Sequence, residues 1–553
     1  MQMRNKTAGR GAASRRQTVV QALALAFRAH GVRHMFGVPG GGSSLDLIDA
    51  ARRQRIDFVL ARHECAAVFM AAASAEIGDG LGVALTTKGP GTANAANGVA
   101  HASLDRNAVA LLTDGFSAQT RSYVTHQWFD QRAHLAPLTK GHSFLADANA
   151  GRDMTELLAR ARAPRRGPVH FELTGSAAKA PLEAPVTPVP AATRAVAPGG
   201  ADLAQARALL TAARRPVVIA GLETPDGSVP RALRRLVRAL GCPSLVTYKA
   251  KGVIADADPH YVGIFTGGAA EQATVRQADL IVTVGLDPVE LILQPWSYTI
   301  PVLELSLTEH PVHYFKARLA LYGDLAASLA GLSTAARKGQ WTRHEIAQLR
   351  EDMRATLAYR GSGRGLTPQQ VVAEAAEAAA GLPRWPRVTV DAGAHMFSAT
   401  AFWPCRAPRD LLISNGLATM GFALPAAIAS ALADPRRATI AFTGDGGLFM
   451  CQGELATAVD VGARIVVVVF NDGALSLIDI KQQQRGLKTA GVRWRHADFA
   501  GAMRAMGGRG YKVRNLAGYR RALAEAFAGE GPALIDVEVD PSGYLQQLAA
   551  LRG

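Results

Sequence analysis

Two short loops in the last third of the chain combine glycine with acidic side chains. The first is Gly444-Asp445-Gly446, and the second is Asn471-Asp472-Gly473, which follows the apolar segment Ile465–Phe470. Glycine lets the backbone approach phosphate oxygens closely, and Mg²⁺ is commonly bound by one or two carboxylates together with the phosphates of a ligand. A single Gly-Asp-Gly is weak evidence, but two such loops separated by one helix and one buried strand form a more specific pattern. We therefore expect a site for a cation and a phosphate-bearing ligand, with Asp445 supplying one oxygen and the second loop supplying more.

A second candidate lies near the amino end, where Arg62-His63-Glu64 opens a helical stretch that continues with Cys65 and alanines. An apolar setting helps a carboxyl group to hold and share a proton, so Glu64 could work as an acid or base. An acid in the first turn of a helix is also favoured by the helix dipole alone. The residues by themselves leave both explanations open.

The segments that must position these groups alternate between strand-like and helical patterns along the whole chain, which is typical of parallel α/β sheets. The sequence predicts three successive doubly wound parallel-sheet domains over residues 17–182, 199–336 and 366–541, preceded by a disordered basic extension, 1–16. A linker rich in Pro and Ala, 180–198, separates the first two. The expected strands are 35–38, 56–60, 82–86, 109–112, 168–173, 216–220, 244–247, 280–284, 302–305, 388–390, 439–442, 465–470 and 533–537.

The bulk composition limits the classes of function. The 553 residues carry a formal charge of +16, but the basic residues are scattered and are not interleaved with aromatic residues, so we expect no nucleic-acid partner. No apolar run is long enough for a membrane span, and no apolar segment typical of a secretory signal follows the basic start. The four cysteines show no metal-binding spacing, which favours a cytoplasmic protein.

Taken together, these motifs resemble those of the thiamine-diphosphate-dependent enzymes of the acetolactate synthase family. The segment 444–472 is similar to their diphosphate-binding signature, and 62–67 is similar to their Arg-His-Glu-x-Ala-Ala segment. The segment 416–427 is similar to their Gly-Leu-Gly-Thr-Met-Gly-Phe-x-Leu-Pro-Ala-Ala. Further matches are 36–41, 89–94 and 391–395 in the outer blocks, and 215–221 and 278–285 in the middle block.

The resemblance implies thiamine diphosphate and Mg²⁺ as cofactors. It assigns Asp445, Asp472 and the carbonyl of Ala474 as metal ligands, and Glu64 as the carboxyl group that acts on the aminopyrimidine ring. FAD is possible but not favoured, because the pair Asn471-Asp472 resembles the flavin-free catabolic acetolactate synthases. The residues implied for cofactor binding are Pro39, Gly40, Glu64, Asn94, Gly393, His395, Met420, Gly444, Asp445, Gly446, Gly447 and Asn471.

For the reaction, the resemblance places Gln127 and Lys140 near the substrate, as further catalytic residues. It implies a carboligase that decarboxylates a 2-oxo acid such as pyruvate and joins the remaining fragment to a second carbonyl compound. The chain departs from the family at His126, Trp128 and Lys481, so the acceptor is open.

Two alternatives remain: a non-oxidative 2-oxo acid decarboxylase or lyase, and a non-catalytic relative that only binds the cofactor. In the family one site is built by two chains. The resemblance therefore implies a homodimer or homotetramer with the active site at the interface.

Overall fold

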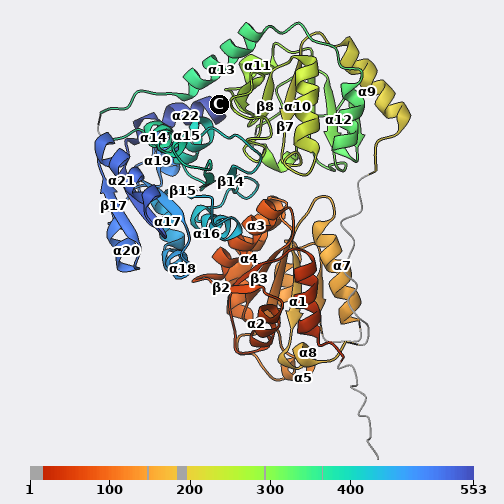
Figure 1. Cartoon of the computed structure of the whole chain (residues 1–553), viewed down its shortest axis with the longest axis vertical. Helices are drawn as coiled ribbons and strands as arrows, with labels where there is room; N and C mark the ends of the chain where they lie inside the picture. The colour runs from red at the N-terminus through yellow and green to blue at the C-terminus, as the bar shows by residue number, and fades with distance from the viewer. Residues whose placement is uncertain (1–15, 146–148, 183–195, 292–293, 364, 553) are drawn as a thin grey trace, which may run out of the picture.

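The computed structural model describes residues 16–145, 149–182, 196–291, 294–363 and 365–552. The expected basic extension (1–16) lies outside these residues except for its last position, and so does most of the expected linker. The described residues form three six-stranded sheets flanked by helices, and every strand pair in them is parallel (Figure 1). The predicted α/β class with three parallel sheets is thus confirmed. None of the described helices is both long and apolar enough to cross a bilayer.

The first sheet has the strand order β2-β1-β3-β4-β6-β5. Its strands are β1 (His34–Val38), β2 (Asp57–Leu60), β3 (Gly82–Thr86), β4 (Val109–Asp114), β5 (His142–Phe144) and β6 (Val169–Leu173). Its helices are α1 (Val19–Ala29), α2 (Ser43–Arg53), α3 (Glu64–Gly78), α4 (Gly89–Leu104), α5 (Ala118–Arg121), α6 (Gln131–Leu135), α7 (Ala150–Arg162) and α8 (Gly175–Lys179). Thr18 and Gln21 close a capping box at the start of α1, which explains why the helix begins there.

The central sheet has the order β12-β11-β10-β7-β8-β9, the arrangement typical of dinucleotide-binding folds. Its strands are β7 (Pro216–Ala220), β8 (Ser244–Val246), β9 (Tyr261–Ile264), β10 (Leu280–Val284), β11 (Val302–Ser306) and β12 (Leu319–Tyr322). Its helices are α9 (Gly200–Ala212), α10 (Val229–Leu240), α11 (Gln272–Val275) and α12 (Leu325–Ser333), and α13 (Arg343–Leu357) leads to the last block.

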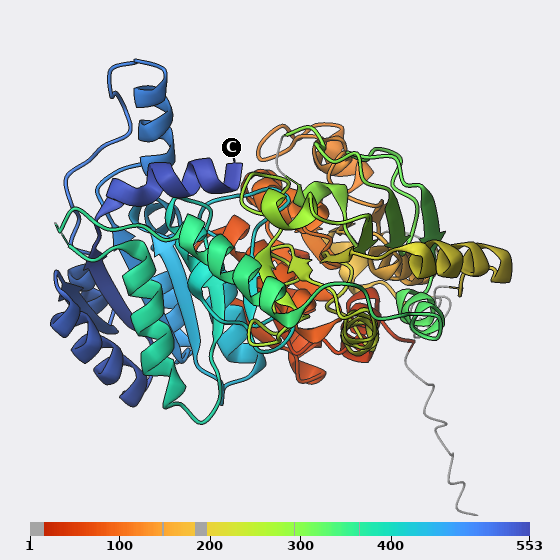
Figure 2. The same ribbon diagram turned by 90° about the horizontal axis from the view of Figure 1, so that it is seen from above.

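The third sheet has the order β14-β13-β15-β16-β18-β17. Its strands are β13 (Arg387–Val390), β14 (Leu411–Ile413), β15 (Thr439–Gly444), β16 (Ile465–Asn471), β17 (Arg509–Val513) and β18 (Ala533–Glu538). Its helices are α14 (Pro368–Ala380), α15 (His395–Phe402), α16 (Ala423–Ala433), α17 (Asp445–Cys451), α18 (Glu454–Asp460), α19 (Ser476–Gln484), α20 (Phe499–Ala505), α21 (Leu516–Ala528) and α22 (Tyr544–Arg552). Seen from above, α19 and the loop after it project from this block (Figure 2).

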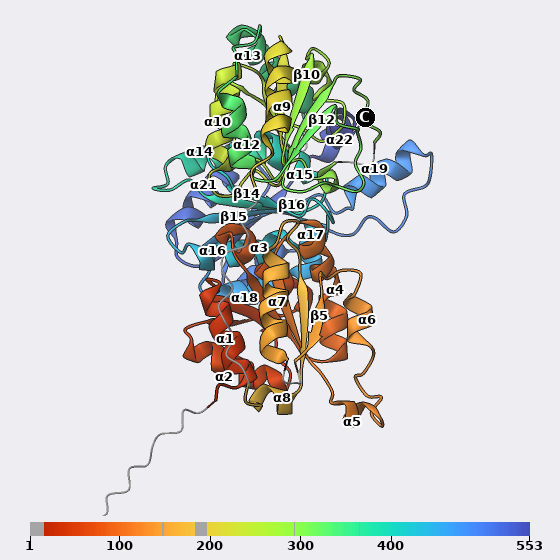
Figure 3. The same ribbon diagram turned by 90° about the vertical axis from the view of Figure 1, so that its right-hand side faces the viewer.

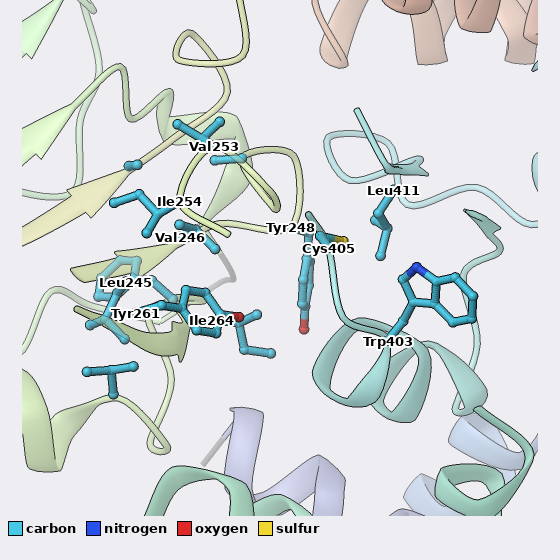
Figure 4. Close-up of a cluster of buried hydrophobic side chains, with 14 of the residues drawn as sticks. Leu245, Val246, Tyr248, Val253, Ile254, Tyr261, Ile264, Trp403, Cys405 and Leu411 are labelled. Atoms are coloured by element: carbon cyan, nitrogen blue, oxygen red, sulfur yellow. The ribbon is translucent and has the colours of Figure 1, made fainter. Parts of the chain in front are cut away.

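The three blocks share buried surfaces. Helix α3 is apolar on all sides because it is covered by its own sheet, by α4 and by α16 of the last block (Figure 3). The rings of Phe69 and Phe422 meet there edge to face, 5.8 Å apart. The central block meets the last block through a second core, in which Tyr248 lies beside Cys405 (Figure 4). These contacts hold the carboxyl ends of the outer sheets in fixed positions.

Candidate active site

The two acidic loops meet at the carboxyl edge of the third sheet. Asp445 is the first residue of α17, directly after β15, and Asp472 directly follows β16. Because β15 and β16 are neighbouring parallel strands, their carboxyl ends bring both side chains to one place. The Asp445 carboxylate is buried and accepts hydrogen bonds from the backbone N–H groups of Gly446 (2.9 Å) and Gly473 (2.8 Å).

The electrostatics of this pair suit a divalent cation. Burial and the neighbouring carboxylate of Asp472 raise the pKa of Asp445 to about 7, and burial raises the pKa of Asp472 to about 6. The hydroxyl of Ser476 (2.5 Å) and the N–H of Ala474 (3.2 Å) donate to Asp472, and both donors are neutral. No group of three or more His, Cys, Asp or Glu side chains among the described residues could hold a metal alone. A cation here would therefore need backbone and ligand oxygens besides the two carboxylates.

A cavity of about 210 Å³ opens beside the two carboxylates. Its floor is glycine backbone: a Cβ atom on Gly446 would lie 3.2 Å from Cε of Met420, and one on Gly447 would lie 2.3 Å from Oδ2 of Asp391. A side chain at Gly447 would therefore overlap Asp391, and one at Gly446 would crowd Met420, so the packing of the chain requires glycine at this floor. The lining residues predicted from the sequence are Gly393, His395, Met420, Gly444, Asp445, Gly446, Gly447, Asp472 and Ala474.

His395 fits an anionic ligand in this cavity. Its ring is buried and stacks on Phe470 with 5.2 Å between the centroids. Burial lowers the pKa of His395 to about 4, so the ring is neutral near pH 7. Its Nε2 atom has no hydrogen-bond partner in the described part of the chain, which leaves it available to a ligand. The unpaired nitrogen, the glycine floor and the acidic pair together fit a diphosphate with its cation.

Asn471 faces away from this cavity. Its Nδ2 atom donates to Oδ1 of Asp536 (2.8 Å), and its Oδ1 atom lies 3.0 Å from Nδ1 of His496. The structure thus places this residue behind the second loop, where it orients the loop. A direct contact of Asn471 with a cofactor stays a prediction.

Glu64 belongs to the first sheet, where it is the first residue of α3 and is 8% exposed. Asn94 of α4 donates its Nδ2 atom to Oε2 of Glu64 at 3.0 Å. The other carboxyl oxygen, Oε1, lies near Gly91, where a Cβ atom would come within 3.3 Å. Pro39 and Gly40 follow β1 at the same edge of the sheet. The structure therefore brings Glu64 and Asn94, which two separate motifs assigned to cofactor binding, into direct contact.

Gln127 lies at the carboxyl ends of the strands of the first sheet, whereas Lys140 lies at their amino ends. The carbonyl oxygen of Gln127 accepts from the N–H of Gly89, at the carboxyl end of β3. Lys140 precedes β5, and its Nζ atom donates to the carbonyl oxygen of Ala163 (3.2 Å). Burial, followed by the charges of Arg160, Arg165 and Arg106, lowers the pKa of Lys140 to about 8. Within one chain Lys140 does not share a site with Gln127, so its catalytic role stays a prediction.

Glu64 and Asp445 occupy separate half-sites in one chain. The residues that line the Asp445 cavity all lie between positions 392 and 544, so none of them belongs to the first block. The amino end of α3 contacts the last block elsewhere: the N–H groups of Arg62 (2.9 Å) and His63 (3.0 Å) donate to Oε1 of Glu454.

Models of three protein families match the chain, one for each sheet. They are described as the N-terminal TPP binding domain, the central domain and the C-terminal TPP binding domain of thiamine pyrophosphate enzymes, and they match residues 17–134, 203–332 and 391–537. The catabolic acetolactate synthase of Raoultella terrigena is 30% identical over 93% of this chain and 93% of its own length. The chain belongs to the thiamine-diphosphate-dependent enzymes of the acetolactate synthase family. The cavity beside Asp445 thus lies in the block that the family description assigns to cofactor binding.

Two further relatives show the range of this acetolactate synthase family. The acetolactate synthase of Bacillus subtilis is 28% identical over 93% of this chain and 91% of its own length. The probable 2-ketoarginine decarboxylase AruI of Pseudomonas aeruginosa is 30% identical over 94% of both. The family therefore includes proteins named for carbon–carbon bond formation and proteins named for decarboxylation.

Sequence reasoning missed two polar contacts of the Asp445 half-site in this thiamine-diphosphate enzyme. The indole Nε1–H of Trp494 donates to Oδ2 of Asp445 at 3.2 Å. Asp391 accepts from the N–H groups of Phe422 (2.7 Å) and Ala423 (2.9 Å) and so holds the start of α16 against the cavity floor. Trp494 follows a loop with no recognisable motif, so nothing in the sequence signals its position.

Proposed function

We propose that this enzyme is a thiamine-diphosphate and Mg²⁺ dependent carboligase of acetolactate synthase type. It would decarboxylate a 2-oxo acid such as pyruvate and join the remaining fragment to a second carbonyl compound. The proposal is supported above all by buried Asp445 and half-buried Asp472, which lie side by side at a cavity floored by glycine. The relatives named acetolactate synthase, at 28% and 30% identity, support the reaction type.

Each residue of the proposed site would have its own role. Asp445, Asp472 and the carbonyl of Ala474 would hold Mg²⁺, and His395 would contact the diphosphate. Thiamine diphosphate, when bound, supplies a nucleophilic carbon and an electron sink. Because Asn94 donates to Oε2 of Glu64, the Oε1 atom remains free to share a proton with the pyrimidine ring.

Product analysis tests the reaction. We would incubate the protein with thiamine diphosphate, Mg²⁺ and a panel of 2-oxo acids and identify the products by mass spectrometry. Acetolactate or acetoin from pyruvate is the expected result. Free aldehyde without any ligation product would overturn the carboligase proposal. It would favour a 2-oxo acid decarboxylase, the alternative suggested by the relative named 2-ketoarginine decarboxylase, so the panel includes a 2-oxo acid with a guanidinium group.

We also propose a homodimer or homotetramer in which Glu64 of one chain faces Asp445 of another. Exposed apolar side chains lie near both half-sites: Leu60 precedes the start of α3, and Phe449 and Met450 belong to α17. Such exposed apolar residues mark surfaces that associate. An interface that joins the half-sites would cover them.

Mixing two inactive variants tests the shared site. Glu64→Gln and Asp445→Asn chains are coexpressed, so that a mixed dimer has one site with both changes and one intact site. Random pairing then restores about one quarter of wild-type activity, because half of the dimers are mixed and half of their sites are intact. A mixture as inactive as each variant alone, although mixed dimers form, would show that each site is built within one chain. Light scattering measures the oligomeric state.

We propose further that the central sheet holds no FAD. In dinucleotide-binding folds the diphosphate lies on a glycine-rich turn after the first strand. Here that turn, after β7, carries Gly221 and then buried Glu223, and Glu290 lies against it. Burial raises the pKa of Glu223 to about 7 and that of Glu290 to about 8. The side chains of Glu223 and Glu290 fill the place where a diphosphate would lie, so we propose a flavin-free enzyme.

A further inference from the structure

A short segment of the last block, residues 492–494, runs along the second acidic loop. The N–H of Leu475 donates to the carbonyl oxygen of Val492 (2.8 Å), and the N–H of Trp494 donates to that of Gly473 (2.9 Å). These two bonds form a minimal antiparallel ladder, which fixes the backbone of residues 492–494 on the loop that holds Asp472. We call these three residues the strap. The strap comes from the loop that follows the projecting helix α19 (Figure 2).

The strap places one aromatic ring against the cation site. The Nε1–H of Trp494 donates to Oδ2 of Asp445 at 3.2 Å. The ring is half-buried, meets Phe449 with 5.9 Å between the centroids, and has its outer edge 3.2 Å from where a Cβ atom on Gly446 would lie. The ring is thus held by packing as well as by its hydrogen bond.

The hydrogen bonds leave the two oxygens of Asp445 unequal. The Oδ2 atom accepts from both Gly473 N–H (2.8 Å) and Trp494 Nε1–H (3.2 Å). The Oδ1 atom accepts from Gly446 N–H (2.9 Å). Each carboxylate oxygen has two lone-pair positions. Two donors fill those of Oδ2, whereas one donor leaves a position on Oδ1 open.

We propose that Trp494 is a positioning residue that makes Asp445 bind its cation through Oδ1 alone, and that it thereby favours Mg²⁺ over Ca²⁺. Mg²⁺ demands octahedral geometry with short bonds to single oxygens, whereas Ca²⁺ also accepts a carboxylate through both oxygens. A donor on Oδ2 blocks the two-oxygen mode and leaves the one-oxygen mode intact. This inference rests on the proposed function only in taking Asp445 as a metal ligand.

The test is the ratio of two dissociation constants. Equilibrium dialysis with thiamine diphosphate present measures the Kd of Mg²⁺ and of Ca²⁺ for the wild type and for Trp494→Phe, which keeps an aromatic ring and loses the donor. Loss of a partner that orients a metal ligand typically weakens affinity 10- to 100-fold. We expect the Kd of Mg²⁺ to rise about tenfold and that of Ca²⁺ to stay equal or fall, so that the preference for Mg²⁺ narrows about tenfold or more.

A matched control is Trp385→Phe, which removes an indole donor from the same block. The Nε1–H of Trp385 donates to the carbonyl oxygen of Pro404 (3.1 Å), and Trp385 is not among the residues that line the cavity. Both Kd values should stay within about twofold of wild type in this variant. Trp494→His, which keeps a ring N–H, should recover part of the Mg²⁺ preference. If melting curves show that Trp494→Phe is unfolded, the Kd values of Trp494→His are compared with those of wild type instead.

The outcomes separate the inference from the proposed function. If the wild type binds both cations and Trp494→Phe changes both Kd values by the same factor or not at all, the inference is wrong and the cation site stands. If the wild type binds neither cation with thiamine diphosphate present, the proposed cation site is wrong and the inference falls with it. A selective loss of Mg²⁺ affinity supports both.

Discussion

The first and third sheets have the same topology and different chemistry. Numbered within each block, both have the strand order 2-1-3-4-6-5, and in both an acidic residue stands at or just after the carboxyl end of the fourth strand. In the third sheet that residue is Asp472, whose pKa is raised by burial. In the first it is Asp114, which accepts from the hydroxyl of Ser43 (2.5 Å) and the N–H of Ser44 (3.0 Å) at the start of α2.

The difference teaches what topology supplies and what it does not. The strand order brings the carboxyl ends together in both blocks, but Asp114 binds the first residues of α2 through Ser43 and Ser44, whereas Asp445 and Asp472 face a cavity. The connection after the second strand differs as well. In the first block it begins α3 with Glu64, and in the third it brings Met420 to the cavity. One fold thus yields one half-site with a buried glutamate, for which we propose proton sharing, and one half-site with two aspartates, for which we propose cation binding.

The largest effect on Mg²⁺ binding is expected from a change at Asp445, one of the two proposed carboxylate ligands. Asp445→Asn removes one of two carboxylates, so the Kd of Mg²⁺ should rise more than the 10- to 100-fold typical of an outer partner. Equilibrium dialysis measures it. Asp114→Asn is the matched control in the sister sheet: it should leave the Kd within about twofold and lower the free energy of unfolding by about 1 kcal/mol, as loss of a hydrogen bond does. If both changes raised the Kd of Mg²⁺ equally, the proposed difference between Asp445 and Asp114 would be wrong.

The next effect is on turnover at the other half-site. Glu64→Gln keeps the shape and the contact with Asn94 but cannot share its proton. We expect kcat to fall about 10²- to 10⁴-fold, the usual contribution of general acid–base catalysis. The Kd of Mg²⁺ should stay within about twofold, because Glu64 does not line the cation cavity. A variant that turns over substrate as fast as wild type would mean that Glu64 only complements the helix dipole.

The sequence predicted the interior strands of the three sheets and missed five of the six edge strands; the exception is β2. The strands expected at 82–86, 216–220 and 280–284 coincide with β3, β7 and β10, which are apolar because helices cover both faces. The five strands not expected are β5, β9, β12, β14 and β17, and all of them lie at sheet edges. Edge strands are short, and several are half-exposed, so their apolar signal is weak.

The candidate site also has a part that the sequence predicted and a part that it did not. Asp445 and Asp472 lie together at one cavity as their spacing predicted, and His395 and Met420, which the family resemblance assigned to the cofactor, line the same cavity. Contacts between distant segments could not be predicted, because nothing local marks them. Trp494 on Asp445 is one example, and Glu454 beneath the amino end of α3 is another. The separation of Lys140 from Gln127 also depends on the path of the chain between β4 and β5, which composition does not reveal.

The smallest effect concerns the central sheet, which has buried carboxyl groups at the ends of its strands, where we propose cofactor contacts in the other two sheets. Burial raises the pKa of Glu290 to about 8, above the ordinary 4.5. Between these two values the Glu290 side chain therefore holds more protons in the folded chain than in the unfolded chain, and its contribution to stability falls as the pH rises. Glu290→Gln does not titrate, so its melting temperature should fall less steeply than that of wild type between about pH 5 and pH 8.

Calorimetry over this pH range measures the effect, and Glu345→Gln is the control. Hydrogen bonds from Thr342 lower the pKa of Glu345 to about 2, so this group stays ionised in the folded chain throughout the range and its loss should leave the slope unchanged. The Oε1 atom of Glu290 accepts from the hydroxyl of Thr247 (2.5 Å), a bond that the Gln carbonyl can keep. If the melting temperatures of Glu290→Gln and wild type fall in parallel as the pH rises, the pKa of Glu290 is not raised in the folded chain. The argument against a diphosphate at β7 rests on the space that Glu223 and Glu290 occupy and would stand in either case.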